Sequence, residues 1–325
     1  MKKLLKSFMT DHPMVEDARP FDFKRKWLQK TQILWIALLI LAFVGIGSLT
    51  LAIPLSFPIN FLMNLEPVEN FLDGSPEVWR EFSFFFINLP LFFGGTYVVM
   101  ALYARFIEKR SLKALGFVTK NKGKKLILGF LFGLISMAIV ALLIVGLTES
   151  TFSTEHLSLS GWDALPMVLL LLIPWGIQAS AEELIFQGWL TPHLGKKYGL
   201  FTAVGVSSFL FMFIHLLNPG INLMGILNLV LYGIFAAFYM LHEKSILGIA
   251  GYHIAWNWAQ GNVFGSLVSG GDTVPASIFG LHSEGHALIT GGEFGTEGSL
   301  VVSLVLLISL ALIFYLQNKR IKKEF

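Results

Sequence analysis

Eight long apolar stretches divide this chain of 325 residues, and they restrict the environment in which it can fold. A helix that crosses a membrane needs about 20 consecutive apolar residues. The stretches lie at about 32–54, 84–104, 126–148, 164–190, 199–217, 221–241, 246–268 and 299–316. The sequence therefore predicts an all-α, polytopic membrane protein of about eight transmembrane helices, with a helical domain over 32–316.

The charge content agrees with a chain that is surrounded by lipid. Only 14% of the residues are charged and 54% are hydrophobic, whereas about 25% of the residues of a soluble domain are charged. Such a composition cannot cover a soluble surface. The chain has no cysteine, which excludes disulfides and thiolate zinc sites.

The positive charges indicate how the chain is oriented. With eight spans, all of the 24 Lys and Arg residues except Arg80 fall on one side. By the positive-inside rule, segments 1–31 and 317–325 are then cytoplasmic tails. The first span follows a charged tail, so we expect it to be retained and not cleaved as a signal peptide. These features favour a bacterial plasma membrane, with the lipid bilayer and no nucleic acid as the partner of the basic loops.

Four ionisable side chains stand out because they lie inside the apolar stretches. An ionisable group at bilayer depth costs about 2.5–3.5 kcal/mol and marks a functional site by default. The eight stretches contain no Asp, Lys or Arg. The four exceptions are Glu182, Glu183, His215 and His253.

The two glutamates are adjacent, so on a helix they point about 100° apart. They cannot act together on one face, which indicates one glutamate for chemistry and one for structure. Gln187 lies four residues after Glu183. This spacing puts both on one face, where we expect them to form a hydrogen bond.

The two histidines each have a partner at the i, i+4 spacing of one helix face. Phe211 lies four residues before His215, and an aromatic ring there can fix the imidazole and exclude water. Asn257 lies four residues after His253, and this pair could stabilise a developing oxyanion. A carboxylate beside a histidine could activate water as a general base.

The order of these motifs resembles a known family. Glu-Glu-x-x-x-Arg, Phe-x-x-x-His and His-x-x-x-Asn on successive membrane helices are the signature of the CPBP family, the CAAX prenyl endoproteases and bacteriocin-processing proteins, also called the Abi family. The resemblance covers about 160–270 with a core at about 125–270, and Arg110–Phe117 looks like the segment that leads into that core. It implies an eight-helix bundle and an intramembrane endopeptidase of the glutamic type.

The resemblance also implies a role for each residue. Glu182 would be the general base and would activate the attacking water together with His215. His253 and Asn257 would stabilise the oxyanion, and Glu183 would support the site. The substrate would be a peptide or a membrane protein, and no cofactor is expected.

Gln187 departs from the family pattern, which has an arginine at this position. Glutamine can donate a hydrogen bond but carries no charge. We therefore predict that Glu183 is protonated, or that the glutamate pair shares a proton, and that this shifts the pH optimum.

Three alternatives remain open from the sequence. Glu182, His215 and His253 could form a His₂Glu zinc site with one open position. The same residues could relay protons in a transporter, or the protein could be an inactive scaffold or immunity protein. A geometric conflict also remains, because the expected boundaries place His215 near the external end of its span and Glu182 much deeper.

Overall fold

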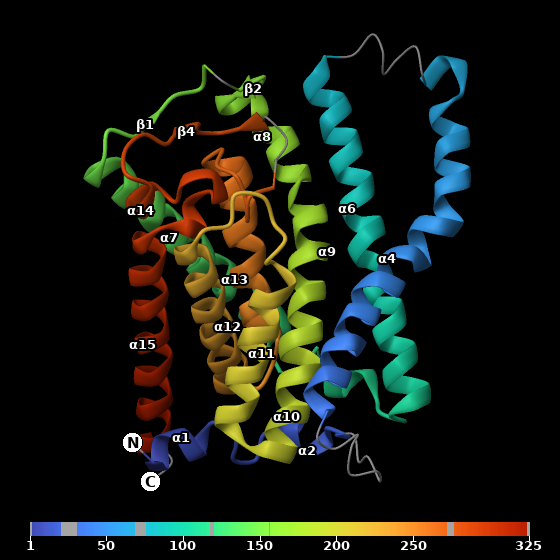
Figure 1. The fold of residues 1–325 in the computed structure, drawn as a ribbon, viewed down its shortest axis with the longest axis vertical. Coiled ribbons are helices and arrows are strands. Elements are labelled where there is room, and N and C mark those ends of the chain that lie inside the picture. The colour runs from blue at the N-terminus through green and yellow to red at the C-terminus, as the bar shows by residue number, and fades with distance from the viewer. Residues whose placement is uncertain are drawn as a thin grey trace.

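The computed structural model describes residues 2–20, 31–68, 76–117, 120–155, 157–271 and 276–323. Nearly all of the regular structure is helical (Figure 1). The long helices are α4 (Gln32–Met63), α6 (Glu77–Leu102), α7 (Lys122–Leu147), α12 (Leu223–Glu243) and α15 (Leu300–Lys323). The shorter ones are α1 (Lys2–Ser7), α2 (Pro13–Asp17), α8 (Gly161–Leu170), α9 (Leu172–Glu183), α10 (Thr191–Tyr198), α11 (Leu200–Ile214), α13 (Leu247–Trp258) and α14 (Ala287–Thr290).

Short π-helical and 3-10 segments interrupt or flank these helices. The π-helical segments are η1 (Tyr103–Ile107), η3 (Leu184–Leu190) and η4 (Ala259–Val263). The 3-10 segments are η2 (Leu112–Leu115), η5 (Gly292–Phe294) and η6 (Thr296–Gly298). In the predicted core, η3 begins directly after Glu183 and η4 begins two residues after Asn257, and π-bulges are frequent at functional sites.

The structure confirms an all-α polytopic membrane protein but corrects the number of long spans. In the described part of the chain, five helices are long and apolar enough to cross a membrane, and α8 with the helix Leu172–Tyr198 forms a sixth, bent span. The stretches expected at 199–217 and 246–268 contain the shorter helices α11 and α13 instead. Ten of the twelve α13 residues are buried, so neighbouring helices surround α13 and its length need not match the bilayer.

The bend between α8 and α9 measures 46° and has a local cause. Pro174 lacks the backbone N–H that would bond to the carbonyl of Leu170, and its ring would clash with that carbonyl. Helix α8 ends at Leu170 and α9 begins at Leu172. The break in this span therefore lies within one turn of Pro174.

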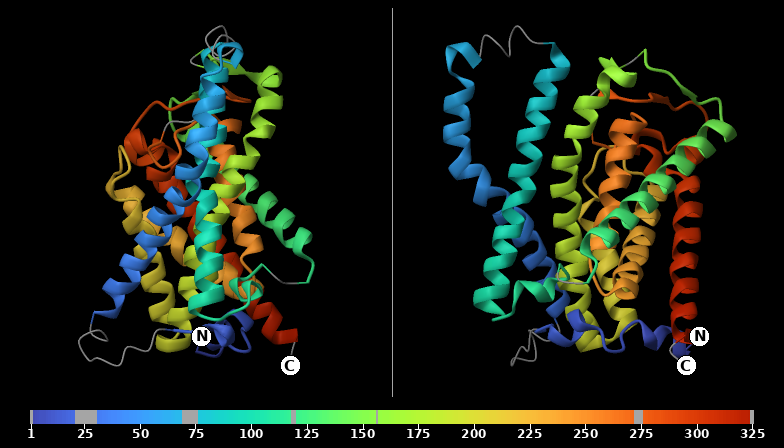
Figure 2. Two further views of the ribbon diagram at one scale, coloured as in Figure 1. Left: turned by 90° about the vertical axis from the view of Figure 1, so that its right-hand side faces the viewer. Right: turned by 180° about the vertical axis from the view of Figure 1, so that it is seen from behind.

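Helix α13 lies in the interior of the bundle, and α7 crosses it diagonally in the right-hand view of Figure 2. Glycines allow the two backbones to touch. A Cβ atom at Gly129 of α7 would collide with the Gly248 carbonyl of α13, and one at Gly133 would collide with the Tyr252 carbonyl. Membrane helices pack through small residues in this way, because lipid supplies no hydrophobic force between them.

Helices α4 and α6 form a hairpin beside α9 (Figure 1). A Cβ atom at Gly95 of α6 would collide with the carbonyl of Gly47 of α4, so this pair also meets through glycine. Helix α4 diverges from the rest of the bundle toward the end that carries the strands, whereas α6 stays beside α9 (Figure 1). This hairpin contributes one wall of the cavity described below.

The two ends of the bundle differ. Both chain ends and Lys196, Lys197 and Lys244 lie at one end, here called the basic end (Figure 1). Helices α1 and α2 pack across it, and the Phe8 ring meets the rings of Phe238 and Phe314. The described part of the expected tail 1–31 is therefore folded onto the bundle, whereas residues 21–30 lie outside the described residues.

Loops and two small strand pairs cover the opposite end, here called the capped end. Strand β1 (Thr151–Phe152) pairs antiparallel with β4 (Leu281–His282), and β2 (Leu159–Ser160) pairs in parallel with β3 (Ala276–Ser277). The glycine-rich segment after α13 forms much of this cap and turns back toward the centre of the bundle (Figure 1).

Candidate active site

A helical hairpin brings Glu182 and His215 to the same depth. One helix runs from Leu172 to Tyr198, eight residues beyond the boundary expected at 190, and α11 returns after Gly199. Gly199 makes the turn with φ of 81°, a conformation that favours glycine. Glu182 lies 17 residues before Gly199 (199 − 182) and His215 lies 16 after it (215 − 199). The conflict over depth thus came from ending the helix too early.

The Glu182 carboxylate lies between the two histidines. Its Oε2 atom is 4.0 Å from Nε2 of His215 and 4.0 Å from Nε2 of His253. This oxygen is buried and has no hydrogen-bond partner among the described residues. A separation of 4.0 Å is too long for a direct hydrogen bond and fits one bridging water.

Both imidazoles are oriented through their other ring nitrogen. Nδ1 of His215 donates to the backbone carbonyl of Phe211 at 2.7 Å. Nδ1 of His253 donates to Oε1 of Glu183 at 2.9 Å. Each acceptor fixes the tautomer, so that both Nε2 atoms face the same carboxylate oxygen.

Glu183 faces away from Glu182 and accepts hydrogen bonds from two donors. The Tyr232 hydroxyl donates to Oε1 of Glu183 at 2.8 Å, and His253 donates to the same oxygen. An oxygen that accepts both bonds carries no proton. The predicted proton on Glu183 would therefore sit on Oε2, which has no hydrogen-bond partner among the described residues.

Gln187 does not form the expected bond to Glu183. Its Oε1 atom accepts a hydrogen bond from Thr191 at 3.0 Å, while Glu183 is held by Tyr232 and His253. The reason is the π-helical segment η3, which begins at Leu184. Backbone bonds in a π-helix run from i to i+5, so the direction of Gln187 relative to Glu183 differs from that in an α-helix.

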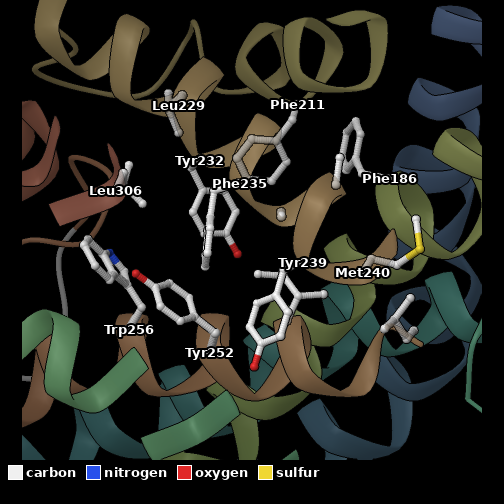
Figure 3. Packing of buried hydrophobic residues seen from close by; sticks show 14 of the residues in the cluster. Phe186, Phe211, Leu229, Tyr232, Phe235, Tyr239, Met240, Tyr252, Trp256 and Leu306 are labelled. Carbon is white, nitrogen blue, oxygen red and sulfur yellow. The ribbon is translucent and has the colours of Figure 1, made fainter. Parts of the chain in front are cut away.

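Aromatic rings enclose the histidines on one side. The Phe211 ring lies 4.8 Å from the His215 ring, as its spacing predicts, and 5.3 Å from the Tyr232 ring. Figure 3 shows Tyr232 among Phe211, Phe235 and Tyr252. These rings hold the imidazoles in place and keep that side of the site apolar.

Sequence reasoning missed two residues that complete the site, Gln178 and Tyr232. Nε2 of Gln178 donates to Oε1 of Glu182 at 2.5 Å, and Oε1 of Gln178 accepts from Asn257 at 2.9 Å. Gln178 thus links the glutamate motif to the His253–Asn257 motif. Its position four residues before Glu182 was a usable signal, whereas the contact of Tyr232 comes from a distant helix.

A buried ionic cluster anchors the helix Leu172–Tyr198, which carries both glutamates, nearer the basic end. Oε1 of Glu108 lies 2.7 Å from Nε2 of His193 and accepts a hydrogen bond from Trp189 at 2.8 Å. Arg110 pairs with Oε2 of Glu108 at 3.0 Å and with Asp17 of α2 at 3.4 Å. Burial alone would raise the pKa of Glu108, but the bonds from His193 and Trp189 and the Arg110 charge lower it below its ordinary value.

The predicted residues converge on one cavity of about 440 Å³. Glu182, His215, His253 and Asn257 line it, together with Gln178 and Tyr232. Helix α6 adds the apolar side chains of Phe85, Leu89, Phe92 and Phe93. This volume lies within the range of small-ligand sites, about 300–1,000 Å³, and accommodates a short stretch of peptide.

The zinc alternative has limited geometric support. Among the described residues, no group of three or more His, Asp or Glu side chains is arranged as a metal site. The zinc alternative names Glu182, His215 and His253, and each Nε2 atom lies 4.0 Å from Oε2 of Glu182.

Fold and site together define a polytopic membrane protein with a buried glutamate–histidine site in a largely apolar cavity. Residues 162–259 match the model of the family described as type II CAAX prenyl endopeptidase Rce1-like. This segment contains both glutamates, both histidines and Asn257, and it is similar to the CAAX-type membrane proteases. A search of the curated proteins and a search of the solved structures each found no match.

Proposed function

We propose that this protein is a glutamic-type intramembrane endopeptidase, with Glu182 as the general base. One observation carries the proposal: Oε2 of Glu182 is buried, lacks a hydrogen-bond partner among the described residues and lies 4.0 Å from two oriented imidazoles. A water bound between these atoms has acceptors for its protons and faces the cavity. The substrate is a peptide or a segment of a membrane protein.

In the first step, His215 holds the water in place and Glu182 takes one of its protons. The water oxygen then attacks the peptide carbonyl carbon. The C–O bond forms as the carbonyl π electrons move to its oxygen. In the second step, the oxyanion electrons re-form the carbonyl, the C–N bond breaks with its electron pair on nitrogen, and the proton held by Glu182 passes to that leaving amine. General base catalysis of this kind contributes about 10²- to 10⁴-fold.

His253 and Asn257 stabilise the oxyanion between these steps, and His253 does so as an imidazolium that keeps its Nδ1 bond to Glu183 and donates from Nε2. The Asn257 amide has two N–H donors and uses one for Gln178, which leaves the other for the substrate. Glu183 and Tyr232 fix the orientation of His253. Donors that are oriented before the reaction need no reorganisation when the negative charge develops.

Cleavage of a quenched peptide library by the purified protein in detergent tests this function. We expect Glu182→Ala to lower the cleavage rate by at least about 100-fold with an unchanged melting temperature. Glu155→Ala, at an exposed glutamate of the capped end, is the matched control and should retain activity.

The same assay repeated with a chelator separates the metal alternative. Cleavage that survives chelation supports glutamate catalysis without metal, and cleavage lost to the chelator and restored by zinc supports the His₂Glu site. A folded wild type that is as inert as Glu182→Ala across the library would favour the scaffold or transporter.

We also propose that the basic end faces the cytoplasm of a bacterial cell, because the positive charges gather there. The chain has no cysteine, so single cysteines report topology directly. In intact cells, a membrane-impermeant thiol reagent should label Glu155→Cys and leave Lys319→Cys unlabelled. The reverse pattern would invert the orientation.

A further inference from the structure

The cavity has a second carboxylate, Glu297, on its wall at the capped end. Its Oε2 atom accepts hydrogen bonds from the backbone N–H of Ser269 at 2.6 Å and from the Ser269 hydroxyl at 2.8 Å. These bonds hold Ser269 at φ of 49°, in the left-handed region. Glu297 thus joins the segment after α13 to the turn before α15, and it places both against the cavity.

One oxygen of Glu297 remains available to a ligand. Oε1 has no hydrogen-bond partner among the described residues, and the residue is only half-buried. The neighbouring side-chain amides donate to backbone carbonyls. Nδ2 of Asn228 donates to the carbonyls of Glu297 and Ser299. Nδ2 of Asn218 donates to the carbonyl of Ser269. The Glu297 charge therefore has no amide donor directed at it from these neighbours.

Apart from its two histidines, the charged side chains that line the cavity are negative. Among the described residues that line it, the carboxylates are Glu182 and Glu297, and there is no lysine or arginine. Oε2 of Glu182 is also unpaired, so two separate acceptors face the same space. A ligand that brings a positive group pairs with Glu297, whereas a ligand that brings a carboxylate would add a like charge at low dielectric.

We propose that Glu297 is a specificity-determining residue that binds a basic side chain, lysine or arginine, of the peptide substrate beside the bond that is cleaved. This inference rests on the proposed endopeptidase function and names the substrate class of the same site. Ionised pairs form the stronger hydrogen bonds in proteins. Because Glu297 and Glu182 hold fixed positions on one cavity, the basic residue and the cleaved bond keep a constant separation along the peptide.

A lysine scan tests the proposal. A neutral host decapeptide with amidated ends receives one Lys at each position in turn, with Gln as the matched neutral residue. We expect wild-type protein in nanodiscs to bind and cleave the favoured Lys peptides at least about 10-fold better than their Gln counterparts. Mass spectrometry of the products should place the cut at a constant number of residues from the Lys.

Glu297→Gln separates charge from structure, because the amide oxygen can still accept the bonds from Ser269. This variant should cleave the Gln peptides within about threefold of wild type, lose the preference for Lys and lose the constant separation. Ser269→Ala removes one of the structural bonds and keeps the charge, so it should retain the preference. A preference that survives Glu297→Gln would overturn the proposal.

Peptide binding, measured separately, tests recognition without catalysis. If Lys and Gln peptides bind wild type equally, including the case where neither binds, the inference fails whether or not peptides are cleaved. If Lys peptides bind better through Glu297 but none is cleaved, the recognition stands and the endopeptidase function fails.

Discussion

At the scale of single residues, the adjacent carboxylates acquire different surroundings because neighbouring helix positions point in different directions. Glu182 faces the cavity and both Nε2 atoms, whereas Glu183 faces Tyr232 and Nδ1 of His253. The second carboxylate therefore orients His253, whose Nε2 atom lies 4.0 Å from Oε2 of the first. Gln178 adds a neutral link, since its amide contacts both Glu182 and Asn257.

Gln178→Leu tests this link. The substitution removes a bond to a charged group, which is worth about 1.5–3 kcal/mol, and releases the Asn257 amide. We expect kcat to fall about 10- to 100-fold with a smaller change in KM. Gln317→Leu, at a buried glutamine near the basic end, is the matched control and should alter stability more than activity. Equal effects on kcat would contradict a role for Gln178 in the site.

Gln187→Arg tests the consequence of the missing family arginine. The side chain of residue 187 is 1% exposed, so an introduced positive charge must find a buried partner. Oε2 of Glu183, which lacks a hydrogen-bond partner among the described residues, is the candidate. We expect the acid limb of the pH–rate profile to move to lower pH, and Gln187→Met to leave it in place. An unchanged profile in Gln187→Arg would reject the predicted shift of the pH optimum.

At the scale of helices, close glycine contacts decide where His253 lies. Helix α13 carries His253 and Asn257 and packs on α7 through Gly129, Gly133 and Gly248. On the other side of the site, the ionic cluster of Glu108, Arg110 and His193 holds the segment that follows the two glutamates. Both contacts are remote from the reacting atoms and position the helices that carry them.

Gly129→Ala tests the packing of α7 on α13. The added methyl group would collide with the Gly248 backbone, and overpacking of this kind costs about 1–3 kcal/mol. We expect a lower melting temperature and reduced peptide cleavage. Gly146→Ala is the control on the same helix, because no atom lies within 4 Å of its added Cβ. A Gly129→Ala protein as stable as this control would show that the helices can separate at little cost.

At the scale of the whole molecule, the N-terminal segment closes the basic end. Phe8 and His12 are fully buried, and Asp17 of α2 reaches the Arg110 of the ionic cluster. Burial and the charges of Lys244 and Arg320 lower the pKa of His12 from 6.5 to about 4. His12 is thus neutral in the docked segment and is protonated more readily when the segment is released.

The docking of residues 2–17 should therefore depend on pH. The contribution of His12 is complete above its released pKa of 6.5 and is lost as the pH falls toward about 4. The loss amounts to at most about 3 kcal/mol. Hydrogen exchange of this segment, corrected for intrinsic rates, should show protection falling over this range. His12→Leu, which is buried but does not titrate, should remove that dependence, and an identical dependence in this variant would refute the assignment to His12.

The sequence by itself determined the features that depend on neighbouring residues. Apolar stretches of membrane length predicted helices, and spacing of i, i+4 placed Phe211 beside His215. The break at Pro174 also followed from a local rule, because a missing N–H acts within one turn. The different directions of the two glutamates followed on the same grounds, and their contacts differ, whereas their separate roles stay a prediction.

Only the tertiary structure decided the features that depend on distant segments. The helix that continues to Tyr198 set the depth of His215. In η3, the Gln187 side chain contacts Thr191 and not Glu183. Tyr232 and Glu297 reach the cavity from segments far along the chain from Glu182. Hydropathy and spacing describe one helix at a time, whereas a site within a membrane forms where several helices pack, and that packing depends on how closely their backbones can approach.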